Sequence, residues 1–164
     1  MEGADVVVND VTPRPHRENR SDWRGLPDVV REIESLGCRL VARTADVTHA
    51  GQVDDMLRQS VEHFGHIDII VNNAGALAGR DRAPVVELEV EQWDRIQRVN
   101  VKGTFLCSRA AARHMIDRGQ GGKIINISSA VGQRGMARYA AYCASKFAVI
   151  DFRPVTRLRT CATT

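Results

Sequence analysis

The chain has 164 residues, of which 43% are hydrophobic and 26% are charged. This hydrophobic fraction excludes an intrinsically disordered chain, and the length suits one domain. The formal net charge of +3 is too small to indicate nucleic-acid binding. No apolar run approaches the roughly 18–20 residues that span a bilayer. The N-terminus lacks the basic start and apolar stretch of a signal peptide, so we expect a cytoplasmic protein.

Strands and helices alternate along the first part of the chain. Residues 4–10 are a β-branched run that predicts a buried strand, and the proline-rich residues 11–27 predict an irregular loop. An apolar stripe starting at Asp28 predicts a helix that ends at Gly37. Residues 39–45 predict a second strand, and residues 50–64 predict an amphipathic helix that ends at Gly65.

The second part repeats this alternation. Residues 67–71 and 123–127 predict strands, residues 90–118 one long helix, and residues 142–151 a final helix. The long helix has an apolar stripe of Trp93, Ile96, Val99, Leu106 and Ala110. Continuous apolar strands between helices are typical of a parallel sheet with helices on both faces. Such sheets bind ligands at the carboxyl ends of their strands, where the polar residues are Asp10, Asp46, Asn73 and Ser129.

Cysteines and histidines show no metal-binding or disulfide pattern. The cysteines at 38, 107, 143 and 161 include no CxxC pair, and the five histidines have no ligand spacing. We therefore expect reduced thiols, solvated histidines and no metal site.

A tyrosine and a lysine four residues apart are the strongest candidates for chemistry. Tyr142 and Lys146 share one face of the predicted helix, and Ser129 follows a predicted strand. A free phenol has a pKa of about 10, and a nearby ammonium group stabilises its phenolate. Such a pair can serve as general acid and base. Alone, the pair is a weak signal, because this spacing is common on helices. Tyr139 is the other candidate for the acid/base, but the residue four positions after it is Cys143, so only Tyr142 has a lysine partner.

Three further features have both a functional and an ordinary interpretation. The run Asn72-Asn73-Ala74-Gly75 lets a flat ligand approach the backbone, or is a plain turn after a strand. Asp10 can accept hydrogen bonds from ribose hydroxyls, or simply cap a loop. Asn100, in mid-helix, marks a kink or a water site, or is exposed to solvent.

Together these motifs resemble one family, the short-chain dehydrogenases/reductases, over residues 3–151. The resemblance rests on VVVND, the pair Asp46-Val47, NNAG at 72–75, RVNVKGTF around Asn100, ISS at 127–129 and YCASK at 142–146. It implies an α/β fold, namely a Rossmann-like doubly wound parallel sheet truncated at both ends. Residues 1–151 would form a partial NAD(P)-binding domain with an inserted loop at 11–27.

The resemblance also implies a reaction, which is hydride transfer between a nicotinamide cofactor and an alcohol or carbonyl substrate. Tyr142 would be the acid/base, assisted by Lys146, which would also hold the nicotinamide ribose. Ser129 would polarise the substrate oxygen, and Asn100 would anchor a water of a proton relay. Besides Tyr142 and Lys146, the cofactor would be lined by Asp10, Asp46, Val47, Asn73, Ala74 and Gly75.

The expected cofactor is NAD, with NADP possible. Asp10 would repel a 2′-phosphate, whereas the arginines at 14, 17 and 20 can bind one. The expected partners are a small-molecule alcohol or carbonyl and further copies of the full-length family member, with no nucleic acid, membrane or metal. The substrate stays open among sugars, steroids, terpenoid alcohols and 3-oxoacyl thioesters.

The chain departs from the family pattern at both ends. The family's first strand and Gly-rich turn are absent, the loop at 11–27 is longer than usual, and residues 152–164 read as an aberrant tail with Pro154 in the helix. In the strand order 3-2-1-4-5-6 the first strand is central, so its absence leaves two unjoined strand pairs. We therefore expect the chain alone to fold poorly and to turn over little or no substrate.

Two non-catalytic interpretations remain open. The chain can be a truncated relative that acts as an oligomerisation or interaction module through helix 90–118. It can also be a nucleotide-binding sensor without chemistry.

Overall fold

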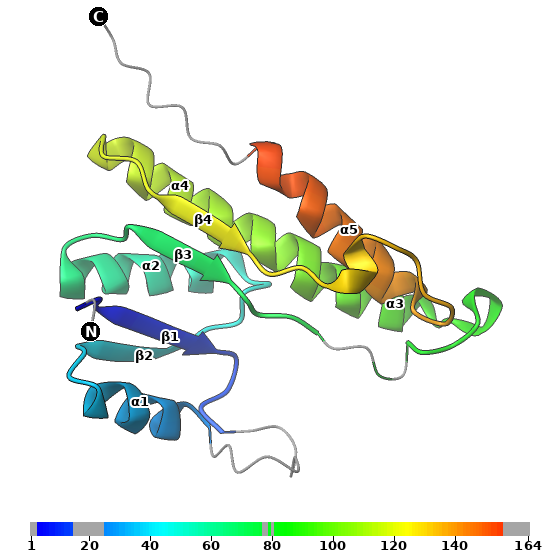
Figure 1. Cartoon of the computed structure of the whole chain (residues 1–164), viewed down its shortest axis with the longest axis horizontal. Coiled ribbons are helices and arrows are strands. Elements are labelled where there is room, and N and C mark those ends of the chain that lie inside the picture. Colours follow the sequence, from blue (N-terminus) through cyan, green and yellow to red (C-terminus); the bar gives the residue numbers. More distant parts are fainter. Residues whose placement is uncertain (1–2, 15–24, 77–78, 80, 156–164) are drawn as a thin grey trace, which may run out of the picture. The chain divides into compact units, whose positions relative to one another are not determined.

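The computed structural model describes residues 3–14, 25–76, 79 and 81–155, and the chain forms two compact units (Figure 1). The first unit comprises Met1–Asp46 and Gly51–His66, and the second comprises Val47–Ala50 and Ile67–Thr164. Most of the loop 11–27, with Arg17 and Arg20, and the tail from residue 156, with Cys161, lie outside the described residues.

The first unit is built on two parallel strands, β1 (Val6–Asp10) and β2 (Leu40–Thr44), paired from Val6–Leu40 to Asp10–Thr44. Helix α1 (Leu26–Ser35) packs on both strands. It begins two residues before the expected Asp28, because Pro27 is tolerated in a first turn, where its missing N–H has no helical partner. Gly37 adopts a left-handed φ of 77° just after the helix, as its expected end requires.

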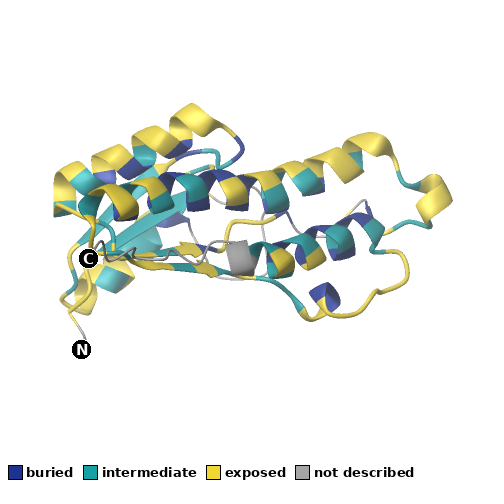
Figure 2. Cartoon of the chain, turned by 90° about the horizontal axis from the view of Figure 1, so that it is seen from above, coloured by how far each residue is buried: buried dark blue, intermediate teal, exposed yellow. Residues whose placement is uncertain are grey.

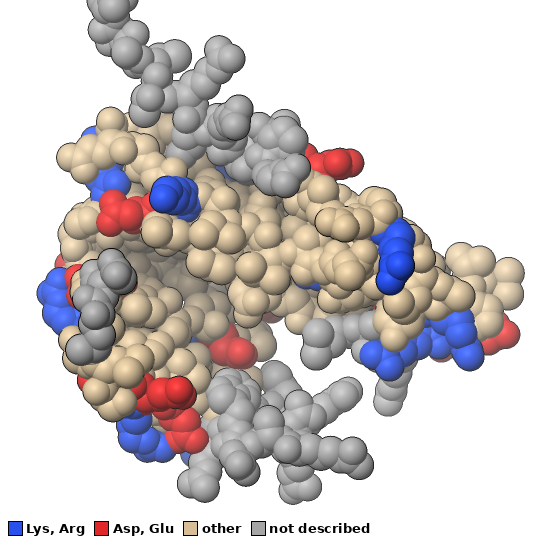
Figure 3. All heavy atoms as spheres, viewed as in Figure 1, with Lys and Arg blue, Asp and Glu red and all other residues tan. Residues whose placement is uncertain are grey.

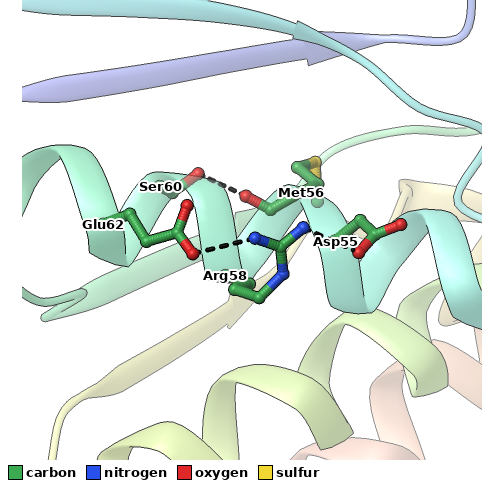
Figure 4. A network of polar contacts seen from close by, with 5 residues as sticks. All are labelled: Asp55, Met56, Arg58, Ser60 and Glu62. Carbon is green, nitrogen blue, oxygen red and sulfur yellow. Dashed lines mark hydrogen bonds and ion pairs between the residues drawn. The ribbon is translucent and has the colours of Figure 1, made fainter.

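Helix α2 (Ala50–Phe64) has the bounds expected from the sequence. Val53, Leu57 and Ser60 are buried on one side, and Gly65 ends the helix with a φ of 86°. On the exposed side, Arg58 pairs with Asp55 at 3.0 Å and with Glu62 at 2.8 Å (Figure 4). Exposed pairs of this kind contribute little stability, so the buried stripe accounts for most of the helix's anchoring.

The second unit contains the parallel pair β3 (Ile69–Asn72) and β4 (Lys123–Asn126), with Asn72 opposite Asn126. Helix α4 (Thr104–Arg118) packs on both strands. Side chains that alternate with Asn72 and Asn126 point to the other face, where Ile69, Val71 and Ile125 are exposed. The described helices of this unit therefore cover one face of its sheet.

The four strands form two separate two-stranded parallel sheets, β1–β2 and β3–β4. No strand in the described ranges is hydrogen-bonded to both pairs. This pairing confirms the expectation of two unjoined strand pairs.

The long helix expected over residues 90–118 is interrupted. It consists of α3 (Val90–Gln97), a π-helical segment η2 (Arg98–Gly103) and α4. A π turn holds more residues than an α turn, so the apolar stripe changes register there. Ile96, Leu106 and Ala110 are buried, whereas Trp93 is 37% exposed and lies outside the core. Figure 2 shows buried and exposed residues alternating along the long helices.

Helix α5 (Ala140–Val155) ends the described chain. It begins two residues before Tyr142 and extends four residues beyond the expected end at Asp151. The Gln97 side-chain amide donates to the main-chain carbonyl of Ala141 at 2.9 Å, and Ala141 packs in a small core with Ala76 and Ile96. These contacts fix the first turn of α5 against α3.

The described surface and helices give no sign of a membrane span or a metal site. Acidic and basic side chains lie in small groups over the face in Figure 3, in keeping with the small net charge. Among the described helices, none has the length and hydropathy to cross a membrane. Within the same ranges, no three His, Cys, Asp or Glu side chains are grouped to hold a metal ion.

Candidate active site

Helix α5 places Tyr142 and Lys146 together one turn apart. Tyr142 is half-buried and Lys146 is only 6% exposed. The Nζ atom of Lys146 lies 5.7 Å from the centroid of the Tyr142 ring. A charged ammonium at this distance interacts favourably with the face of an aromatic ring.

The ammonium group of Lys146 is anchored by Ile127, the first residue after β4. Its Nζ donates a hydrogen bond to the main-chain carbonyl of Ile127 at 2.9 Å. Burial lowers the pKa of Lys146 from its ordinary 10.5, because desolvation disfavours the charged form. An ammonium has three N–H donors, and within the described part of the chain two of them have no acceptor.

Asn100 is buried, so the solvent-exposed alternative given for it in the sequence analysis is wrong. It is 1% exposed and lies in the π-helical segment. Its Oδ1 accepts the main-chain N–H of Ala76 at 2.7 Å, and its Nδ2 donates to the Ser145 hydroxyl at 2.9 Å. Asn100 therefore joins the loop after β3 to α5 across the helix that carries it.

Gly75 lies beside both Asn100 and Lys146. A Cβ atom at Gly75 would sit 3.4 Å from the Asn100 Oδ1 and 3.9 Å from the Lys146 Nζ. Asn73, Ala74 and Gly75 are all exposed. The bare Cα of Gly75 therefore leaves the approach to the ammonium group open at an accessible segment.

Ser129 follows β4 and precedes the short 3₁₀ helix η3 (Ala130–Gly132). It is half-buried and extended, and its side chain makes no hydrogen bond to the helix that it precedes. The carbonyl of Ser129 accepts the N–H of Gly132 at 2.9 Å, so the backbone turns immediately after the serine.

The residues expected on the adenosine side are divided between the two units. Asp10 ends β1 in the first unit, where one carboxylate oxygen accepts the N–H of Thr12 at 3.1 Å. Asp46 follows β2, and its N–H donates to the Gln52 side chain at 2.7 Å. Val47 belongs to the second unit, where it packs against Gly103.

Two polar residues of the sequence motifs, Asn72 and Ser128, have hydrogen-bond partners that the sequence does not reveal. Asn72 donates to both Ser108 and Asn126 at 2.8 Å, which ties β3 to β4 and α4. Ser128 donates to the main-chain carbonyl of Lys146 at 2.9 Å. These partners lie 18 to 54 residues apart, so only the folded chain brings them together.

Parallel strand pairs covered by helices are typical of a Rossmann-like α/β fold, in which ligands bind beyond the carboxyl ends of the strands. The family described as short chain dehydrogenase matches residues 3–161, and the chain belongs to this family. The predicted α/β, Rossmann-like class is thereby confirmed.

Characterised relatives support the same family. The chain is 40% identical over 131 residues to 2-dehydro-3-deoxy-D-gluconate 5-dehydrogenase of Escherichia coli, covering 80% of this chain and 49% of the relative. It is 38% identical over 150 residues to sorbitol dehydrogenase of Cereibacter sphaeroides, covering 92% of this chain and 52% of the relative. The chain thus spans about half the length of these relatives.

A solved structure gives the same result for the fold. A short-chain type dehydrogenase/reductase from Mycobacterium marinum superposes with a TM-score of 0.80 at 36% identity. The match covers 92% of this chain and 56% of that one. The described elements therefore correspond to part of a larger fold of this family.

Proposed function

We propose that the chain carries the catalytic tyrosine and lysine of an NAD(P)-dependent oxidoreductase that acts on CH–OH groups. The observation that carries the proposal is the buried Lys146 ammonium 5.7 Å from the Tyr142 ring. In the oxidation direction, Tyr142 takes the hydroxyl proton while a hydride leaves the carbinol carbon. In reduction, Tyr142 returns the proton to the oxygen.

The residues beside Lys146 fit a nicotinamide cofactor. Two N–H donors of Lys146 have no acceptor among the described residues and could meet ribose hydroxyls, and the missing Cβ of Gly75 leaves room for such a group. The bound cofactor would supply the hydride acceptor or donor at its nicotinamide ring. Ser129 would hold the substrate oxygen, and Asn100 would hold the loop and α5 in place.

We propose NAD over NADP as the preferred cofactor. The carboxylate of Asp10, at the carboxyl end of β1, favours ribose hydroxyls and disfavours a 2′-phosphate. Arg14, also described and exposed, is the arginine that opposes this preference. The ratio of the NAD and NADP dissociation constants, compared with that of Asp10→Ala, tests the assignment.

The substrates to examine first are polyols and sugar acids. The names of the relatives include sorbitol dehydrogenase, 2-dehydro-3-deoxy-D-gluconate 5-dehydrogenase and galactitol 2-dehydrogenase of Agrobacterium fabrum, which is 36% identical over 153 residues. All three names describe oxidation or reduction of a carbon chain rich in hydroxyl groups. The proposed site of action is the cytoplasm, which the free thiols of Cys38, Cys107 and Cys143 support.

The decisive experiment compares the two tyrosines of the chain. Turnover of the polyols with NAD by the purified chain is expected to be weak, since the chain spans half of its relatives. Tyr142→Phe should lower it at least ~100-fold, the usual effect of losing a general acid/base. Tyr139→Phe, the matched control, should retain it. Equal effects of the two substitutions would contradict the proposal.

A second candidate is an oligomerisation module. Helices α4 and α5 expose three large apolar side chains, Phe105 (42%), Ile116 (63%) and Phe147 (41%). Exposed apolar groups of this size favour association with a similar surface. Light scattering of the purified chain and of Phe105→Ser tests this candidate, which predicts a dimer that the substitution dissociates. If the chain is an oligomerisation module, it should also co-purify with a full-length homologue, and this should not require bound cofactor.

A further inference from the structure

The loop after β4 is held on Lys146 by hydrogen bonds to both its side chain and its main chain. The Lys146 Nζ donates to the carbonyl of Ile127, and the hydroxyl of the next residue, Ser128, donates to the carbonyl of Lys146. Both hydrogen bonds are 2.9 Å long. The lysine is therefore bound at its side chain and at its backbone by two consecutive residues.

Gly132, at the end of the same loop, makes this contact possible. A Cβ atom at Gly132 would lie 2.6 Å from the Ser128 hydroxyl and 2.7 Å from the main-chain oxygen of Lys146. Side-chain carbons do not approach backbone atoms so closely, and the carbonyl of a helix residue cannot move aside. Only glycine therefore lets η3 pack on α5 at this level.

We infer that Ser128 and Gly132 are positioning residues of the proposed site, which seat the loop carrying Ser129 on the main chain of Lys146. The inference rests on the proposed function. Ser129 follows Ser128 directly, and Tyr142 lies one helical turn before Lys146. The seating therefore sets the position of the Ser129 hydroxyl relative to Tyr142 and that of the Lys146 ammonium relative to the Ile127 carbonyl.

The small number of lysines makes this inference testable without turnover. The chain has only Lys102, Lys123 and Lys146. Selective ¹³C labelling of lysine Cε therefore gives three NMR signals, and the titration of Lys146 reports the surroundings of its ammonium group. The Tyr142 ring and the Ile127 carbonyl are the described groups in contact with it.

Ser128→Ala should loosen the loop and let water reach the ammonium. The titration midpoint of Lys146 should then rise toward its ordinary value, by about 0.5 or more. Ser128→Thr keeps the hydroxyl and should keep the wild-type midpoint. Gly132→Ala should raise the Lys146 midpoint further. If Gly132→Ala does not fold, the comparison of Ser128→Ala with Ser128→Thr still tests the inference.

Ser60→Ala is the matched control. The Ser60 hydroxyl donates to the main-chain carbonyl of Met56 at 2.6 Å in α2, so the substitution removes the same kind of hydrogen bond away from the site (Figure 4). It should lower the melting temperature and leave the Lys146 signal unchanged. If Ser128→Ala behaves like this control, its hydrogen bond is merely structural and the inference is overturned.

The measurement uses neither cofactor nor substrate, so it is independent of the turnover experiment. If Tyr142→Phe and Tyr139→Phe have equal effects on turnover, but Ser128→Ala shifts the Lys146 midpoint, only the proposed function is contradicted. If Tyr142→Phe lowers turnover as expected, but Ser128→Ala leaves the Lys146 midpoint unshifted, only the positioning role is contradicted.

Discussion

The side-chain oxygen of Asn100 accepts the main-chain N–H of Ala76 at 2.7 Å, deep in the second unit. The same side chain donates to Ser145 on α5, and Asn100 is 1% exposed. A single amide thus satisfies buried groups on two other segments. Its removal would leave the Ala76 N–H without a partner and without access to water.

Asn100→Ala should therefore destabilise the chain strongly. A buried donor that loses its acceptor costs ~1–3 kcal/mol, and here the hydrogen bond to Ser145 is lost as well. We expect a loss of about 3 kcal/mol in the free energy of unfolding, measured by urea denaturation.

Asn73→Ala provides the control for this substitution. Asn73 is exposed, so replacing it should change the free energy of unfolding of the unliganded chain by less than about 0.5 kcal/mol. Similar losses for the two variants would show that the contacts of Asn100 do not anchor the loop.

The contrast between α2 and Asn100 shows what the sequence can predict. The bounds of α2 follow from local signals, an apolar stripe and a terminal glycine, and both were sufficient. The burial of Asn100 depends on Ala76 and Ser145, which lie 24 and 45 residues away. No local pattern contains such a pairing, and asparagine alone is as compatible with exposure.

The same limit applies to the loop after β4 and to the long helix. Ser129 and Lys146 are recognisable from motifs, but the role of Ser128 depends on a carbonyl 18 residues away. The apolar stripe predicts one continuous helix over residues 90–118, whereas the structure has a π-helical segment at Arg98–Gly103. Side-chain pattern alone does not reveal such a segment.

Gly103→Ala should destabilise the chain for a steric reason. Gly103 has an ordinary helical φ of −59°, so alanine would meet no backbone strain there. Its Cβ, however, would lie 2.8 Å from a methyl carbon of Val47. Overpacking against a β-branched side chain costs about 1–3 kcal/mol, and we expect a loss in this range in urea denaturation.

Gly51→Ala is the control for Gly103→Ala. Gly51 lies in α2, and a Cβ there would have no atom within 4 Å. Alanine is the better helix former, so this substitution should stabilise the chain by up to ~1 kcal/mol. If Gly103→Ala is equally stabilising, Val47 moves freely and the close packing is unimportant.

The lowered pKa of Lys146 predicts a pH dependence of stability. The folded chain releases this proton at a lower pH than the unfolded chain, whose lysine has the ordinary pKa of 10.5. Between the two values the unfolded state binds more protons, so the free energy of unfolding rises with pH.

This rise is measured as a difference between wild type and Lys146→Met. The wild type should gain stability relative to the variant as the pH approaches 10.5. Lys123→Met, at an exposed position of β4, controls for the loss of a positive charge. A constant difference between wild type and Lys146→Met across this range would contradict the lowered pKa.

Cys107 predicts the opposite pH dependence in an overlapping range. Burial raises the pKa of the Cys107 thiol from 9.0 to about 11, because the thiolate is poorly solvated in the core. The unfolded chain loses this proton first, so the free energy of unfolding falls as the pH rises from 9.0 to about 11. The slope is at most ~1.4 kcal/mol per pH unit, and Cys107→Ala should remove that part of the decline.

Alkylation of the folded chain gives a second measurement of the burial of Cys107. This thiol is 5% exposed and should react far more slowly than the half-buried Cys38. Equal alkylation rates, or an unchanged pH profile in Cys107→Ala, would show that this thiol is not enclosed in the core of the second unit.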